Sequence, residues 1–110
     1  MGAMTDSDRP SPSPEAVFDS ISAQAQETNR IRVEALAEVI LRSDPTGLSE
    51  DDRRQAKDLA HQIAGSAGTF GFDLASEVAR QVEQLLLREP DSAQLAELEQ
   101  QVVELRSALA

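Results

Sequence analysis

Residues 58–72 read Asp-Leu-Ala-His-Gln-Ile-Ala-Gly-Ser-Ala-Gly-Thr-Phe-Gly-Phe and contain the only histidine of the 110-residue chain, His61. Apolar residues recur at helical spacing through this stretch and just before it. They are Ala56, Leu59, Ala60, Ile63, Ala67 and Phe70. On a helix with about 100° per residue they form one face, and His61 falls almost opposite that face. The pattern predicts a core-lining helix that carries His61 on its outer surface.

The neighbours of His61 on that outer surface follow from the same helical geometry, because residues three and four positions apart are adjacent. Counting outward, they are Lys57, Asp58, Ala64 and Gly65, then Arg54 and Gly68. Each glycine costs about 1 kcal/mol relative to alanine inside a helix. Both glycines are predicted on the solvent side, where crowding in the core does not explain them. We therefore expect a partner to approach the backbone closely beside His61.

An alternative is that the helix ends near Ala64 and that the two glycines belong to a loop. The apolar stripe continues past them through Ala67 and Phe70, which favours one uninterrupted helix.

The rest of the chain predicts further helices and shows no period-two alternation typical of strands. Ser13-Pro14-Glu15 is a helix-start signature, and the helical segment it opens extends to about residue 42. Its polar middle, residues 26–32, leaves open whether it forms one helix or two. Residues 43–47, Ser-Asp-Pro-Thr-Gly, form a turn cluster, and acidic residues 50–52 open the next helix behind Ser49.

Two more helices follow the glycine-rich stretch. An apolar stripe over residues 75–86 stops before Pro90, and residues 91–94, Asp-Ser-Ala-Gln, repeat a capping pattern. A narrow apolar seam, Leu95 to Leu109, marks the last helix. We expect an all-α fold: an antiparallel four-helix bundle with an additional N-terminal helical segment.

Residues 15–110 are predicted to form this bundle as one domain. Residues 1–14 are polar and contain three prolines, so we expect a disordered tail. Its first four residues, Met-Gly-Ala-Met, resemble a remnant of cloning.

Composition excludes several classes of function. The chain carries 20 acidic residues against 10 Lys plus Arg, a formal net charge of −10, so we expect neither nucleic acid nor an anionic membrane surface as a partner. It contains no cysteine, which excludes disulfides and cysteine-based zinc sites. No apolar run approaches the roughly 18–20 residues of a membrane span, and no secretory signal is visible, so we expect a cytoplasmic protein.

An exposed histidine flanked by small residues suits a reaction in which another macromolecule comes to the imidazole. Neutral imidazole is nucleophilic near pH 7. Once phosphorylated it would gain negative charge, which Lys57 and Arg54 could partly balance. A catalytic triad needs a pocket with convergent groups, and a zinc site needs three or four ligands, so a single histidine on a convex helix fits neither.

The segment from Ala60 to Gly71 resembles the signature of histidine-containing phosphotransfer (HPt) domains: Ala-His, an apolar residue two positions later, then Lys-Gly-Ser-Ala-Gly, an apolar residue and Gly. The resemblance implies a four-helix bundle in which His61 is the phosphoacceptor. His61 would accept a phosphoryl group from the aspartyl phosphate of a receiver domain and pass it to another receiver. Gly65 would let the receiver reach His61.

The resemblance also implies what the chain leaves to its partners. We expect response-regulator receiver domains, a hybrid histidine kinase, or both, and a monomeric carrier without kinase activity of its own. No cofactor is expected on this chain, since the receiver supplies the Mg²⁺. The family usually has a lysine three residues after the histidine, where this chain has Ala64. Our hypothesis is that Lys57, one turn earlier on the same helix side, takes over part of that role.

Three alternatives remain. The chain could be a bundle that binds a receiver or another helical partner without being phosphorylated, which Ala64 favours. It could be the phosphoacceptor domain excised from a chemotaxis-type histidine kinase. It could also dimerise as a coiled coil through the seam from Leu95 to Leu109, although two heptads hold a dimer weakly.

Overall fold

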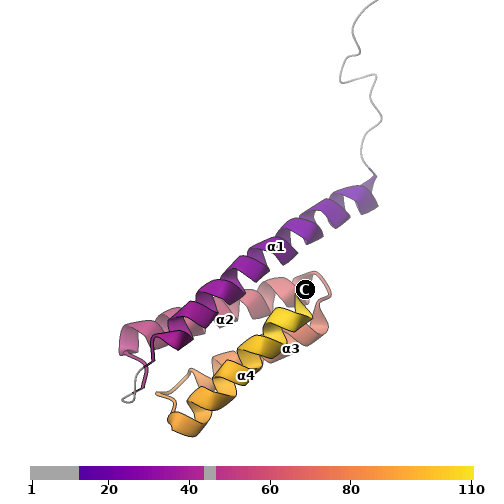
Figure 1. Cartoon of the computed structure of the whole chain (residues 1–110). Helices are drawn as coiled ribbons and strands as arrows, with labels where there is room; N and C mark the ends of the chain where they lie inside the picture. Colours follow the sequence, from indigo (N-terminus) through magenta and orange to yellow (C-terminus); the bar gives the residue numbers. More distant parts are fainter. Residues whose placement is uncertain (1–12, 44–46) are drawn as a thin grey trace, which may run out of the picture.

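The computed structural model describes residues 13–43 and 47–110, so residues 1–12 of the predicted tail and residues 44–46 of the turn cluster lie outside the described part. The described residues form four helices and no strand, which confirms the all-α bundle (Figure 1). The helices are α1 (Pro14–Leu41), α2 (Glu50–Thr69), α3 (Asp73–Leu85) and α4 (Ser92–Ala108). None of them is long and apolar enough to cross a membrane.

α1 begins as the sequence predicts. The Ser13 hydroxyl accepts a hydrogen bond from the backbone N–H of Ala16, and Pro14 occupies the first turn. The helix is continuous to Leu41, so the expected N-terminal helical segment is the first part of α1 and not a separate helix. Figure 1 shows this part extending beyond the ends of the other three helices. There Phe18 packs against Phe70, which follows α2, with ring centroids 5.7 Å apart.

The polar middle of α1 stays helical because its side chains have partners on other helices. The Gln26 amide and the Arg30 guanidinium both donate to the carbonyl oxygen of Leu109, at 3.1 and 2.7 Å. Asn29 is fully buried, and its amide nitrogen lies 3.1 Å from the hydroxyl oxygen of Ser66 on α2. These contacts join α1 to the end of α4 and to the last turn of α2.

The four helices form a closed ring in which each one packs against its two neighbours, in the order α1, α2, α3, α4. The core consists of small and medium aliphatic side chains from all four helices, including Leu36, Ile63, Val82 and Leu105, each fully buried. Their close packing supplies the hydrophobic free energy that isolated helices of this length lack.

α2 is one uninterrupted helix through both glycines, so the alternative of a loop after Ala64 is wrong. Ser49 caps its N-terminus by accepting from the N–H of Asp52, and Phe70 is the residue that ends it. Gly71 then adopts a positive φ of 82°, which a residue without Cβ tolerates, and the chain reverses into α3. The predicted capping box at the start of α4 is present between Asp91 and Gln94.

Candidate functional site

His61 lies on the outer surface of α2, as the helical pattern predicts, with 76% of its side chain exposed. The helix presents it opposite Ile63, which is fully buried in the core. The imidazole is therefore accessible to a macromolecule without any opening of the bundle.

Glu83 on α3 holds one nitrogen of this imidazole. Its carboxylate oxygens lie 2.9 and 3.2 Å from Nδ1 of His61. A carboxylate can only accept hydrogen bonds, so this contact assigns the proton of a neutral ring to Nδ1. The lone pair of Nε2 is then left free on the exposed side. The pair consequently orients the ring with its nucleophilic nitrogen toward solvent.

Glu83 was missed by the sequence analysis. It follows Val82, a fully buried residue of the α3 stripe, and its own side chain is 23% exposed. An acidic residue at the border of an apolar stripe was the available signal. Deciding that it meets His61 requires knowing how α3 lies against α2, which the stripe alone does not give.

The two glycines beside His61 differ in their surroundings. At Gly65 no atom lies within 4 Å of the position a Cβ atom would take, so the helix surface is open there, as expected. At Gly68 the Ser76 hydroxyl oxygen lies 3.1 Å from that position. The expectation that packing does not explain Gly68 is therefore wrong, because α3 approaches α2 closely at this residue.

Ala64 is also placed differently from the expectation. It was predicted on the outer surface beside His61, but it is only 5% exposed and belongs to the core. The backbone carbonyl of Ala64 accepts a hydrogen bond of 2.8 Å from Ser76 on α3. The helical stripe underestimated the buried face of α2 because α3 covers this side of it.

A shallow depression begins one turn past His61, between α2 and α3. It is lined by Ala64, Gly65, Gly68 and Thr69 of α2 and by Asp73, Ser76, Glu77 and Arg80 of α3. Its floor is made of small residues, and charged side chains of α3 form one wall. Next to the imidazole, the surface of α2 is therefore free of large side chains, and the surface of α3 carries charged ones.

The two cations predicted near His61 do not behave alike. Lys57 is half-buried on α2, one turn before His61, as its spacing requires. Arg54 lies nearly two turns before His61, and its guanidinium is 3.4 Å from the carboxylate of Glu50. Lys57 therefore lies one turn from the imidazole, whereas Arg54 is paired with Glu50 at the start of α2.

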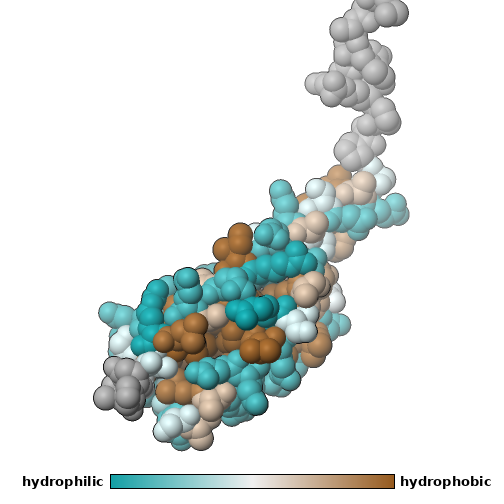
Figure 2. Space-filling model, viewed as in Figure 1, coloured by the Kyte–Doolittle hydropathy of each residue, from teal (hydrophilic) through white to brown (hydrophobic). Residues whose placement is uncertain are grey.

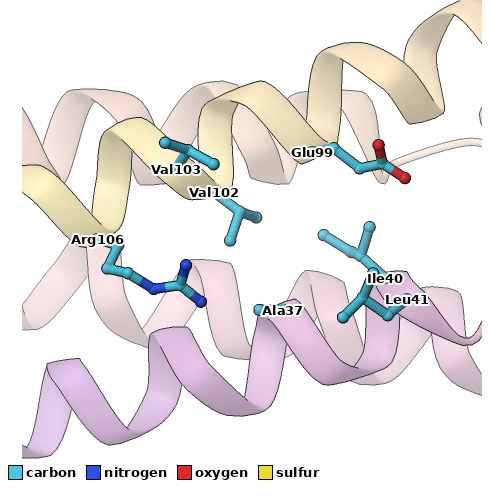
Figure 3. Close-up of a pocket in the computed structure, with 7 residues that line it drawn as sticks. All are labelled: Ala37, Ile40, Leu41, Glu99, Val102, Val103 and Arg106. Atoms are coloured by element: carbon cyan, nitrogen blue, oxygen red, sulfur yellow. The ribbon is translucent and has the colours of Figure 1, made fainter.

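A second concavity lies on the other side of the bundle, between α1 and α4. Figure 2 shows hydrophobic side chains on this face, and Figure 3 shows the residues that line the groove. They are Ala37, Ile40, Leu41, Glu99, Val102, Val103 and Arg106. Since α2 and α3 contribute nothing to its lining, this groove is separate from the surface around His61.

The fold and the site together define an all-α bundle whose distinctive reactive group is one exposed, oriented imidazole. A comparison with protein-family models matches the Hpt domain over residues 20–110. The chain therefore belongs to the Hpt domain family. Neither the search of curated proteins nor the search of solved structures found a match. Family membership supports a histidine phosphotransfer role in two-component phosphorelays, in which Hpt domains interact with receiver domains and kinases.

Proposed function

We propose that this chain is a phosphorelay intermediate that accepts a phosphoryl group on Nε2 of His61 from a receiver-domain aspartyl phosphate and passes it to another receiver. The observation that carries the proposal is the exposed imidazole of His61, held at Nδ1 by Glu83 so that Nε2 faces outward. We further propose that the protein has no kinase activity of its own and acts in the cytoplasm.

The chemistry needs little from this chain beyond an oriented nucleophile. The lone pair of Nε2 attacks phosphorus, the bond between phosphorus and the aspartyl oxygen breaks, and the carboxylate leaves with the bonding electrons. The proton stays on Nδ1, so the phosphorylated ring becomes an imidazolium cation. Glu83 faces this positive charge at hydrogen-bond distance and stabilises it, which favours phosphorylation of the ring. The reverse sequence returns the group to an aspartate.

The receiver brings the remaining parts of the active centre. In this proposal its Mg²⁺, held by the acidic residues of the receiver's own pocket, would neutralise the phosphoryl oxygens during transfer. That pocket has to come close to Nε2, and the open helix surface at Gly65 offers the space for it.

A panel of radiolabelled phospho-receiver domains tests the proposal. We expect label to appear on the wild-type chain, in a form that is labile in acid, and to disappear when a second, unlabelled receiver is added. His61→Gln is the control: it should unfold at the same urea concentration as the wild type, because the residue is exposed, but take up no label.

The same experiment separates the competing functions. Receivers that bind without transferring label would make the chain an interaction module, the reading that Ala64 favours. Label arriving only from ATP and the catalytic domain of a chemotaxis-type histidine kinase would identify an excised phosphoacceptor domain. Neither outcome is compatible with the relay proposed here.

A further inference from the structure

Three residues of α3, Ser76, Arg80 and Glu83, face α2 at successive levels along the helix. Ser76 donates to the carbonyl of Ala64, and Glu83 contacts the imidazole of His61. Arg80 lies between these two residues on α3, and a terminal nitrogen of its guanidinium is 3.9 Å from the Cβ position at Gly68, about two helical turns past His61 on α2. Since residues three apart on a helix have Cβ atoms about 5–6 Å from each other, the side chain of Arg80 starts beside that of Glu83, and its exposed guanidinium can turn from Gly68 toward His61.

Arg80 is exposed and, within the part of the chain that the structure describes, it forms no ion pair and no side-chain hydrogen bond. Most other arginines in the described ranges are engaged. Arg30, Arg42, Arg53, Arg54 and Arg106 each have a carboxylate partner, and Arg32 bonds to Asn29. Asp73 and Glu77 line the same depression as Arg80, but neither is within ion-pair distance of it. The donors of its guanidinium are therefore available to a ligand.

We propose that Arg80 binds the phosphoryl group carried by His61 and supplies, from α3, the positive charge that Ala64 does not supply from α2. This inference rests on the proposed function. A guanidinium presents donors in a planar fork that matches the oxygens of a phosphoryl group. Arg80 occupies the side of His61 on which Ala64 and Gly65 lie, whereas Lys57 lies one helical turn away in the opposite direction. Arg80 lines the same depression as Ala64, so it is placed to replace a cation at residue 64.

The role is one of binding and not of bond making. Transfer to Nε2 leaves two negative charges on the phosphoryl oxygens and one positive charge on the ring. Glu83 balances the ring through Nδ1, and Arg80 balances the oxygens beyond Nε2. Glu83 and Arg80, which are neighbours on one face of α3, would thus stabilise the positive ring and the negative phosphoryl group of the same phosphohistidine.

The test phosphorylates His61 without a receiver, using phosphoramidate. The imidazole attacks its phosphorus, the phosphorus–nitrogen bond breaks, and the nitrogen leaves as ammonia. The wild type, Arg80→Gln and Arg80→Lys are loaded, freed of reagent, and followed by ³¹P NMR at pH 7 to obtain the lifetime of the phosphohistidine. Arg88→Gln is the matched control, because Arg88 is an exposed arginine beyond the end of α3 and its substitution changes the net charge equally. Circular dichroism checks that each variant is folded.

We expect Arg80→Gln to shorten the lifetime by about 1.5- to 5-fold, the range for a charge-assisted contact at an exposed site. Arg80→Lys should recover part of the loss, and Arg88→Gln should match the wild type. Equal lifetimes for Arg80→Gln and the wild type would overturn the inference. If, in that case, the unphosphorylated Arg80→Gln chain also bound a receiver more weakly than the wild type, Arg80 would be a docking residue and not a phosphoryl-binding one.

The two proposals fail in different ways. If phosphoramidate loads His61 but no receiver exchanges the label, the relay function is wrong and the lifetimes still decide the role of Arg80. If the wild type cannot be loaded at all, there is no phosphoryl group for Arg80 to bind and both proposals are wrong.

Discussion

The hydroxyl oxygen of Ser76 on α3 lies 3.1 Å from the position that a Cβ atom would occupy at Gly68 on α2. That separation is tighter than an ordinary van der Waals contact, and Ser76 is fixed by its hydrogen bond to the carbonyl of Ala64. The fold itself therefore accounts for a glycine at residue 68. Gly65, with no atom within 4 Å of its Cβ position, has no such reason within the bundle.

Gly65→Ala is expected to stabilise the protein and to impair its function. Alanine in an open, regular helical position gains up to about 1 kcal/mol in the free energy of unfolding. The added methyl group would stand where the receiver has to approach His61, so transfer should slow by about tenfold or more. Urea unfolding and transfer kinetics measure the two effects on one sample.

Gly68→Ala is the matched control for that variant. The same helical gain is offset there by the contact with Ser76, so we expect little or no increase in stability. Transfer at the wild-type rate by Gly65→Ala would show that the open surface at Gly65 is not used by the receiver.

Glu83→Gln is expected to slow phosphorylation of His61 by roughly 3- to 10-fold. The amide is isosteric with the carboxylate and can still accept from Nδ1, but it no longer balances the positive charge of the phosphorylated ring. Initial rates of loading by a phospho-receiver measure the effect, with Glu104→Gln, an exposed acid on α4, as the control. A Glu83→Gln protein that loads as fast as the wild type would reduce Glu83 to a surface contact.

Lys57→Ala tests the hypothesis that Lys57 replaces part of the missing lysine. Lys57 is one turn from His61, and its charge would reach the phosphoryl group only across an exposed surface. We therefore expect a small effect, about two- to threefold on the phosphohistidine lifetime. No change in either loading or decay would mean that the hypothesis is wrong.

The periodicity of apolar residues was sufficient to predict the fold. It placed helices around His61, within residues 75–86 and after Asp91, because each has a one-sided stripe, and Ser49 and Asp91 mark the starts of the first and last of these three. It could not decide whether residues 26–32 interrupt the first helix. Their polar side chains bond to Leu109 and Ser66, and such pairing depends on how distant segments pack together.

The candidate site was predictable only on the helix that carries His61. Exposure of the imidazole and open space at Gly65 follow from the geometry of a single helix. Burial of Ala64, the close contact at Gly68 and the pairing with Glu83 all arise from α3. Nothing in residues 58–72 records the position of that neighbouring helix, so these three features could not be derived from the stretch itself.

The protein is expected to be a monomer. The groove between α1 and α4 has exposed apolar residues at its edges, Leu41 and Val103, but it encloses only about 200 Å³. The seam of α4 is not free for a coiled coil, because Leu98, Leu105 and Leu109 are fully buried in the bundle. Light scattering after size exclusion checks the mass, and a dimer that Val103→Glu dissociates would show that this face associates.

Glu50 at the start of α2 should make stability depend on pH. Its carboxylate accepts hydrogen bonds from Arg53, which lower the pKa of Glu50 below its ordinary value of 4.5. Arg53 also donates to the carbonyl of Leu86, at 2.7 Å, and so ties the first turn of α2 to the end of α3. Because the pKa is lower in the folded state, the unfolded chain binds more protons in acid.

The contribution of Glu50 is therefore complete above its unfolded pKa and is lost as the pH falls through the folded value. Glu50→Gln should unfold at lower urea concentration than the wild type at pH 7, and the difference should shrink as the pH falls below 4.5. Asp51→Asn, which removes an exposed acid from the same turn, should show less of this pH dependence. If both variants lose the same stability at every pH, the pairing with Arg53 contributes nothing beyond the interaction of any acid with the start of a helix.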